Sequence, residues 1–303
     1  MQRSQIESLL TTIKALPPFP SGVSRLMSLS QRDPAYFEKA SALIKADPAL
    51  AGQVVRIANS ALYAGQTRVD DLERAIMRVG IRMVVASLTS AWLKRAFDPS
   101  RSLLAAVWLD NLLSALVARG IAERAGWHEI GSEAAYTYGM LHDVGRLVLM
   151  ALYQRGMERV LEERLCPVTA LSAREHEVFG VSHALAGRLL ANRWNFPNDM
   201  AMVIAAHHFP RAQRVGMPPH INQIIDLVLI ADFIAFRLGD AETLTEELEI
   251  RILDDISSGA GLELITALDL APSTLLEAIR PALGRMEQHC NMLGIPHRFA
   301  SKA

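Results

Sequence analysis

The chain of 303 residues is 50 % hydrophobic and 21 % charged, which excludes a disordered protein and leaves room for two packed units of about 100–200 residues. With 31 basic and 32 acidic residues, the net charge is −1, so the sequence shows no bulk attraction to nucleic acid or to an anionic membrane surface. Aromatic residues make up 6 % of the chain and no segment alternates apolar and polar residues as a strand does, so we predict an all-α fold.

The N-terminal segment and the most apolar segment of the chain argue against export and against membrane insertion. Residues 1–14 carry charges among their apolar residues and lack the apolar core of a signal peptide, so they read as an amphipathic helix. The most apolar stretch, residues 224–236, contains Asp226 and Asp232 and is too short to span a bilayer. Two cysteines, Cys166 and Cys290, are too few for a disulfide scaffold. We therefore expect a cytoplasmic protein that does not associate with a membrane.

The first helix is predicted to end at a proline-rich segment, Leu16–Pro20, because proline lacks the backbone N–H and restricts the residue before it. Asp47 then precedes Pro48, which places a capping side chain before a proline at the first helical position. This pair predicts a helix over residues 48–59.

The next helices are marked by a capping box and a glycine. Asp70, with Glu73 three residues on, resembles the start of a helix, and Gly80 is suited to the backbone conformation that ends one. A further helix is predicted from residue 81 to residue 97. Asp98-Pro99-Ser100 then breaks the pattern, so we place a domain boundary there, between an N-terminal lobe (1–99) and a second domain (100–303).

The second domain is predicted to be helical throughout, with turn signals between its helices. The expected helices cover residues 103–120, 132–154, 155–163, 171–193, 198–208, 220–238 and 273–292. Trp92, Trp108, Trp127 and Trp194 are expected in the core or between the domains.

Several histidines and aspartates fall in apolar helical segments of the second domain. They are His142, Asp143, His183, His207, His208 and Asp232. Imidazole nitrogen and carboxylate oxygen suit iron, manganese or zinc at a hydrolytic centre, and a carboxylate such as that of Asp143 can bridge two ions. Because adjacent helical residues point about 100° apart, we expect a helix end near the His142-Asp143 pair, with Gly145 close by.

Asp232 lies in a strongly apolar run, where a carboxylate is costly unless it is paired, hydrogen-bonded or bound to a metal. Other polar residues could have a purely structural role instead of binding a metal ion or a phosphate. The His142-Asp143 pair could cap a helix and bond across the core, and His208 could turn to solvent. Arg211 and Arg214 read as a solvated loop, with a phosphate-facing patch as the alternative.

Several segments resemble known signalling proteins. GMLHDVGR at residues 139–146 resembles the signature of the HD superfamily of metal-dependent phosphohydrolases. Four N-terminal segments narrow the resemblance to the HDOD family, the HD-related output domain of bacterial signalling proteins: LPPFP at 16–20, ADPAL at 46–50, RIANSALY at 56–63 and AIMRVG at 75–80. The resemblance extends from about residue 10 to about residue 240.

The resemblance implies an HD-type helical bundle with an additional N-terminal helical lobe, in a regulatory protein. It also implies one or two divalent metal ions (Fe, Mn, Zn or Mg), held by a ligand set drawn from Asp110, His142, Asp143, His183, His207, His208 and Asp232. Asp110 stands where the metal-binding relatives have a histidine, which would make the centre harder and more anionic.

Two functional classes follow from the resemblance. The first is a signalling module that binds a partner protein or a small ligand. The second is a phosphohydrolase acting on a nucleotide or a cyclic dinucleotide, in which Asp143 holds the metal and Arg146 binds phosphate. The Gly-Tyr-Pro motif of the HD-GYP relatives, which hydrolyse cyclic di-GMP, is absent, because Phe209-Pro210-Arg211 follows His208. Cyclic di-GMP specificity is therefore not implied, and we expect the signalling class.

Overall fold

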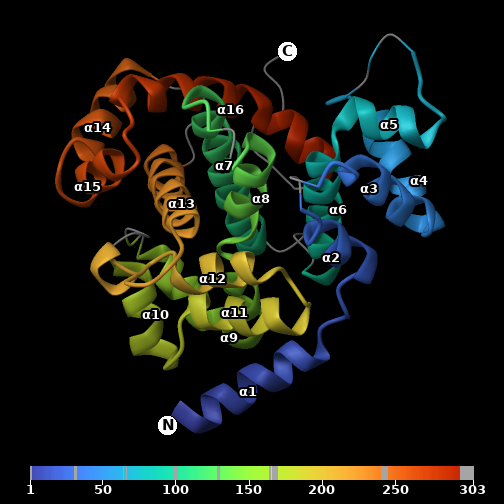
Figure 1. Ribbon diagram of the computed structural model, residues 1–303. Coiled ribbons are helices and arrows are strands. Elements are labelled where there is room, and N and C mark those ends of the chain that lie inside the picture. Colours follow the sequence, from blue (N-terminus) through green and yellow to red (C-terminus); the bar gives the residue numbers. More distant parts are fainter. Residues whose placement is uncertain are drawn as a thin grey trace.

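The computed structural model describes residues 2–30, 33–63, 65, 67–97, 102–127, 130–163, 165, 170–239 and 245–293. Within these ranges every regular element is a helix, which confirms the all-α prediction (Figure 1). The helices are α1 (Gln2–Ala15), α2 (Ser21–Met27), α3 (Tyr36–Lys45), α4 (Pro48–Ala58), α5 (Leu72–Val79), α6 (Ile81–Ala96), α7 (Ser102–Arg124), α8 (Ser132–Leu141), α9 (Val144–Glu162), α10 (Ser172–Phe179), α11 (His183–Arg193), α12 (Asn198–Ala206), the short 3-10 helix η2 (Arg211–Gln213), α13 (Pro219–Leu238), α14 (Glu246–Ile256), α15 (Gly259–Ala267) and α16 (Pro272–Leu293).

Helices α2 to α6 pack together on one side of the molecule, and local capping explains their boundaries (Figure 1). As predicted, the Asp47 side chain caps α4 by accepting hydrogen bonds from the N–H groups of Ala49 and Leu50. The capping aspartate of α5 is Asp71, which accepts from the Arg74 N–H, and not the predicted Asp70. Gly80 has a φ of +81° and joins α5 to α6 across a bend of 93°.

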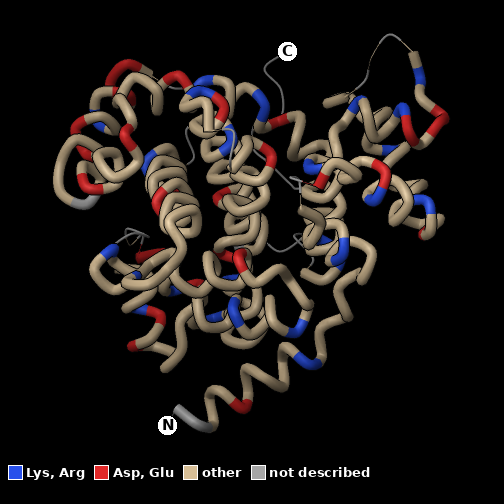
Figure 2. Tube along the Cα trace, in the orientation of Figure 1, with Lys and Arg blue, Asp and Glu red and all other residues tan. Residues whose placement is uncertain are grey.

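Helix α7 is the central helix of the larger part of the molecule. It packs against α8, α13 and α16, which surround it in Figure 1. Residues 104–124 of α7 have the length and apolar composition of a membrane span, but 72 % of the most apolar window is buried inside the fold. This burial is typical of a core helix, which explains the apolar composition of α7. In the view of Figure 2, acidic and basic residues are interspersed over the whole molecule.

The structure divides two predicted helices. The predicted helix over 132–154 is interrupted between α8 and α9 at His142-Asp143, which confirms the helix end expected at this pair. The predicted helix over 171–193 is wrong in the middle, because α10 ends at Gly180, whose φ is +71°, and α11 starts at His183. Helices α2, α3, α14 and α15 were not predicted.

An aromatic cluster joins α6 and the segment before α2 to the end of α11. The ring centroids of Trp92 and Trp194 lie 4.6 Å apart, and Phe19 packs against both tryptophans and against Phe196. Trp92 and Trp194 therefore pack as predicted, and Trp108 is buried in the core. The proposed boundary at residues 98–100 lies outside the described residues, as does Cys166.

Helix α1 lies along α9 and α11, at the lower edge of the molecule in Figure 1. The Arg193 guanidinium of α11 donates a hydrogen bond to the Lys14 carbonyl at 3.1 Å. Helix α1 thus covers part of α9 and α11, the helices that begin directly after Asp143 and at His183.

Candidate metal centre

Most of the predicted ligand residues lie at helix ends. His142 and Asp143 form the break between α8 and α9, His183 is the first residue of α11, and His207 and His208 directly follow α12. Asp110 and Asp232 are the exceptions, because they lie inside α7 and α13. Apart from Asp110, these residues lie in or next to five helices, α8, α9, α11, α12 and α13, whose packing brings the side chains to one buried region.

Two glycines allow α9 to approach α11 closely. A Cβ atom on Gly145 would lie 1.9 Å from the His183 carbonyl oxygen and 2.6 Å from the Gly187 nitrogen. Only a residue without a side chain fits between these two backbones. Since Asp143 immediately precedes α9 and His183 begins α11, this contact sets the distance between their side chains.

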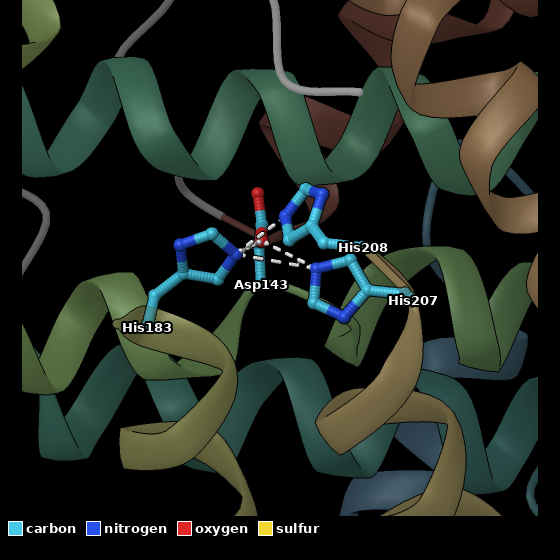
Figure 3. A group of neighbouring side chains, drawn as sticks. All are labelled: Asp143, His183, His207 and His208. Atoms are coloured by element: carbon cyan, nitrogen blue, oxygen red, sulfur yellow. Dashed lines mark hydrogen bonds and ion pairs between the residues drawn. The ribbon is translucent and has the colours of Figure 1, made fainter. Parts of the chain in front are cut away.

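The first ligand group consists of Asp143, His183, His207 and His208, whose side chains point toward one another in Figure 3. Asp143 Oδ1 lies 3.0 Å from His183 Nε2 and 3.3 Å from His207 Nε2. His183 Nε2 lies 3.2 Å from His207 Nε2 and 2.7 Å from His208 Nε2. Atoms bound to one metal ion at about 2.1 Å lie roughly 3.0–3.4 Å apart, so most of these separations match a shared ion.

Hydrogen bonds at the other ring nitrogen orient two of these imidazoles. His183 Nδ1 faces Glu175 Oε2 at 2.5 Å, and His207 Nδ1 faces the Ile204 carbonyl at 2.9 Å. Both partners are acceptors, so each Nδ1 carries the proton and each Nε2 has a free lone pair in the neutral ring. Lone pairs of His183 and His207 then converge with the Asp143 carboxylate, and they need a cation between them, either a proton or a metal ion.

The second ligand group consists of His142, Asp143 and Asp232, all buried. His142 Nε2 lies 3.4 Å from Asp143 Oδ2 and 3.4 Å from Asp232 Oδ1, while His142 Nδ1 faces the Gly139 carbonyl at 2.7 Å. Among the described residues, neither His142 Nε2 nor Asp232 Oδ2 has a hydrogen-bond partner. Buried polar atoms of this kind fit a divalent metal ion as their partner.

The buried charges shift the pKa values of the site in opposite directions. Burial lowers the pKa of His142 and of His183, but nearby carboxylates outweigh it and raise these values to about 10 and about 9. Burial is the main cause that lowers the pKa of His207, and it holds that of His208 well below the usual range, with help from the neighbouring histidines. Protons on His142 and His183 thus balance the carboxylates, and a metal ion would displace them.

Arg146 is buried and lies on Asp143 rather than in an open phosphate site. Its Nη2 is 2.7 Å from Asp143 Oδ2, and this guanidinium, with His142 and His183, outweighs burial and holds the pKa of the Asp143 carboxyl well below its usual range. Asp110 is half-buried on α7 and acts electrostatically on Arg146, but it belongs to neither ligand group. The predicted ligand residues other than Asp110 thus lie together in these two groups.

Glu175 was not among the predicted site residues. Its carboxylate is fully buried, and Oε2 accepts hydrogen bonds from both Nδ1 and the backbone N–H of His183. A carboxylate behind a histidine fixes the ring and makes Nε2 a stronger ligand. The sequence signal for this contact is Gly180, which can end a helix between Glu175 and His183 and so allow the chain to turn back and bring the two side chains together.

Three side-chain alternatives are decided by the structure. His208 does not turn to solvent, because its Nε2 faces His183. The solvated loop is confirmed for Arg211, which is exposed, and is wrong for Arg214, which is buried; both guanidinium groups bind the buried carboxylate of Asp226. The Arg211 Nη2 and Arg214 Nη2 atoms lie 2.6 Å and 2.5 Å from the Asp226 oxygens.

Comparisons with solved structures agree with this architecture. A protein from Marinobacter aquaeolei VT8, provisionally described as a signal transduction protein, is 21 % identical with a TM-score of 0.70 over 97 % of this chain and 66 % of its own. An HDOD domain protein of unknown function from Geobacter sulfurreducens is 21 % identical with a TM-score of 0.69, over 95 % of this chain and 99 % of its own. A provisionally described phosphohydrolase from Shewanella amazonensis SB2B is 20 % identical, with a TM-score of 0.62 over 95 % of this chain and 97 % of its own.

Sequence comparison identifies the family. An uncharacterized protein from Treponema pallidum (strain Nichols) is 26 % identical over 250 residues, which cover 81 % of this chain and 47 % of the relative. The chain thus spans about half the length of that relative. The family model of the HDOD domain matches residues 16–210. This range includes the four N-terminal motifs, the His142-Asp143 pair, His183 and the His207-His208 pair. The chain therefore belongs to the HDOD domain family.

Proposed function

We propose that this chain is a regulatory module of signal transduction that holds a divalent metal ion at Asp143 and acts by binding a partner protein or a small ligand. The observation that carries the proposal is the orientation of three imidazoles. His142, His183 and His207 each bond an acceptor oxygen through Nδ1, so each presents Nε2 to an Asp143 oxygen. Such pre-set ligand geometry is what a metal site requires.

The donor set favours zinc, iron or manganese over magnesium. Three imidazole nitrogens and one carboxylate oxygen surround the first position, whereas Mg²⁺ prefers oxygen ligands and retains water. The first ligand group is therefore the expected position of the first ion. The second group, with one imidazole and two carboxylates, would hold a second ion next to the cationic Arg146.

The state of Arg146 favours regulation over hydrolysis. A catalytic arginine must contact the substrate phosphate, but this guanidinium is buried and paired with Asp143. Asp143, His183 and His207 are also fully buried. A metal held among these side chains would fix the relative positions of α9, α11 and the end of α12, and a change in occupancy would alter the surface that a partner reads.

A metal-dependent phosphohydrolase is the second candidate, and the position of Asp143 favours it. Asp143 belongs to both ligand groups, with Oδ1 toward the first and Oδ2 toward the second, as a bridging carboxylate would. Two bound ions would supply a water of lowered pKa as the nucleophile. In that case Arg146 would have to leave Asp143 to contact a phosphate.

Metal analysis and an activity panel test the proposal. We expect about one equivalent of zinc, iron or manganese in the purified chain, loss of that metal in Asp143→Asn, and its retention in the surface control Asp255→Asn. We also expect little hydrolysis of nucleotides, phosphodiesters and cyclic dinucleotides. Absence of metal after reconstitution would refute the metal site, whereas rapid metal-dependent hydrolysis would make the enzyme the primary function.

A further inference from the structure

Arg146 is a fixed cation beside the candidate metal centre. It lies in the first turn of α9, and its backbone N–H donates to the Asp143 carbonyl at 2.9 Å, so one helical turn carries both residues. Only 4 % of Arg146 is exposed, and a guanidinium keeps its charge when it is buried. Burial by itself lowers the pKa of Arg146, but nearby carboxylates, first of all that of Asp143, outweigh it and raise this value. The positive charge of Arg146 is therefore a permanent part of the centre.

The Arg146 guanidinium and the second ligand group share one carboxylate oxygen. The Arg146 Nη2 atom lies 2.7 Å from Asp143 Oδ2. The same Oδ2 lies 3.4 Å from His142 Nε2, which in turn lies 3.4 Å from Asp232 Oδ1. An ion held by this group would therefore contact the oxygen that already pairs with Arg146. Two cations on one carboxylate oxygen repel each other, and the repulsion is strongest where water is excluded.

The first ligand group uses the other oxygen of Asp143. Oδ1 lies 3.0 Å from His183 Nε2 and 3.3 Å from His207 Nε2, whereas the ion pair of Arg146 is with Oδ2. An ion in the first group thus binds the oxygen that is not paired with the guanidinium. The charge of Arg146 should therefore weaken the second position more than the first.

The buried charges of the described site balance with a single divalent ion. The carboxylates of Asp143, Asp232 and Glu175 are buried, and Arg146 compensates one of their three negative charges. Histidines are neutral when they bind a metal ion, so one divalent ion supplies the two positive charges that remain. Asp110 is only half-buried and belongs to neither ligand group, so water screens its charge. A second divalent ion would leave two uncompensated positive charges in a buried region.

We infer that Arg146 takes the place of a second metal ion and limits the centre to one tightly bound divalent ion. The inference rests on the proposed metal site, and it assigns the one ion to the first ligand group. It also supplies a physical reason for regulation without hydrolysis, because a two-ion mechanism needs the second position to be filled. Arg146 is in this sense a residue that determines how many ions the chain holds.

Titration of the full chain with Mn²⁺, followed by electron paramagnetic resonance, tests the inference. The signal of free Mn²⁺ counts the bound ions, and two Mn²⁺ ions on one carboxylate give the distinct spectrum of a coupled pair. We expect the unchanged chain to bind a second Mn²⁺ at least tenfold more weakly than the first. Arg146→Met removes the charge and keeps a side chain of similar length. In this variant the Kd of the second ion should fall at least tenfold, and the coupled-pair spectrum should appear.

Two further variants and a control complete the design. Arg155→Met is the matched control, because Arg155 is exposed on the same helix and its replacement should leave the second Kd unchanged. Arg146→Gln repeats the test with a different uncharged side chain, should methionine prevent folding at this buried position. Asp232→Asn, added to Arg146→Met, should remove the second ion and leave the first. The two Kd values of the unchanged chain test the inference without any variant.

Two Mn²⁺ ions that bind the unchanged chain with Kd values less than tenfold apart would overturn the inference. So would a second Kd that falls less than tenfold in both Arg146 variants, or a second ion that persists after Asp232→Asn is added. The proposed metal site fails separately. No ion bound by the unchanged chain would refute that site and the inference with it, whereas one ion in the unchanged chain and in both Arg146 variants would refute the inference alone.

Discussion

Glu175 holds His183 at two points. Its Oε2 lies 2.5 Å from His183 Nδ1 and 2.8 Å from the His183 backbone nitrogen. The same carboxylate oxygen therefore fixes both the first turn of α11 and the plane of the imidazole. Because the carboxylate is fully buried, water cannot replace it.

Glu175→Gln should lower the affinity for the metal ion by about 10- to 100-fold, because the amide polarises the imidazole less and orients it less firmly. Competition with a chromophoric chelator measures this affinity. Glu177→Gln is the matched control, since Glu177 is on the same helix but binds Arg174 at the surface. Equal affinities in the two variants would contradict an orienting role for Glu175.

Gly145→Ala should destabilise the fold and weaken metal binding together. Its Cβ would meet the backbones of His183 and Gly187, which cannot yield as a side chain can, so α9 must move away from α11. Overpacking of this kind costs roughly 1–3 kcal/mol, and the distance from Asp143 to His183 would increase. Urea unfolding and chelator competition measure the two effects.

Gly52→Ala is the control for that substitution. Gly52 is exposed in α4 and a Cβ atom there would meet nothing within 4 Å. Alanine should therefore stabilise the protein by about 1 kcal/mol through helix propensity. A Gly145→Ala protein as stable as Gly52→Ala would show that the helices do not depend on this close contact.

Asp226→Ala should lower the free energy of unfolding by about 3–5 kcal/mol, because it leaves the buried guanidinium of Arg214 without its carboxylate. Asp226 and Arg214 are nearly inaccessible to solvent. Asp255→Ala removes a comparable ion pair with Arg237 that is more than one-third exposed, and should cost about 1 kcal/mol or less. Similar losses in both variants, measured in urea, would count against the buried pair as an anchor.

His289 should make the protein sensitive to acid. Burial lowers its pKa from 6.5 to about 4, so the folded state favours the neutral ring. Its contribution to stability is complete above pH 6.5 and is lost as the pH falls toward 4. Between pH 7.5 and pH 4.5 this loss amounts to roughly 2–3 kcal/mol.

His289→Gln should remove that part of the loss, measured as the difference in urea-unfolding free energy between the two pH values. His176→Gln, a change at an exposed histidine of α10, provides the comparison. If both variants lost as much stability in acid as the unchanged chain, protonation of His289 would not be the cause.

The fold class and much of the ligand set could be predicted because they depend on local pattern. The break at His142-Asp143 followed from the angle between adjacent helical residues, and the cap at Asp47 followed from the proline after it. The cap of α5 is Asp71 and not the predicted Asp70. Because either of two adjacent aspartates can cap a helix, the sequence alone does not tell which of them does so.

Contacts that depend on the path of the backbone could not be predicted in the same way. In one continuous helix, Glu175 and His183 would lie about 12 Å apart along the axis and could not bond. The turn at Gly180 brings them together. Likewise, Arg214 has the sequence context of a loop, and only the packing of that loop against α13 buries it with Asp226.

The hydrogen bonds from His142 to the Gly139 carbonyl and from His207 to the Ile204 carbonyl lie at the C-terminal ends of α8 and α12. Helix ends leave carbonyls without partners, so one bond both completes the helix end and aims the imidazole. Folding itself thus orders these two imidazoles, so an ion bound at the proposed site would not have to organise them. Exchange of the ion should then be limited by passage past His208, the partly exposed member of its group.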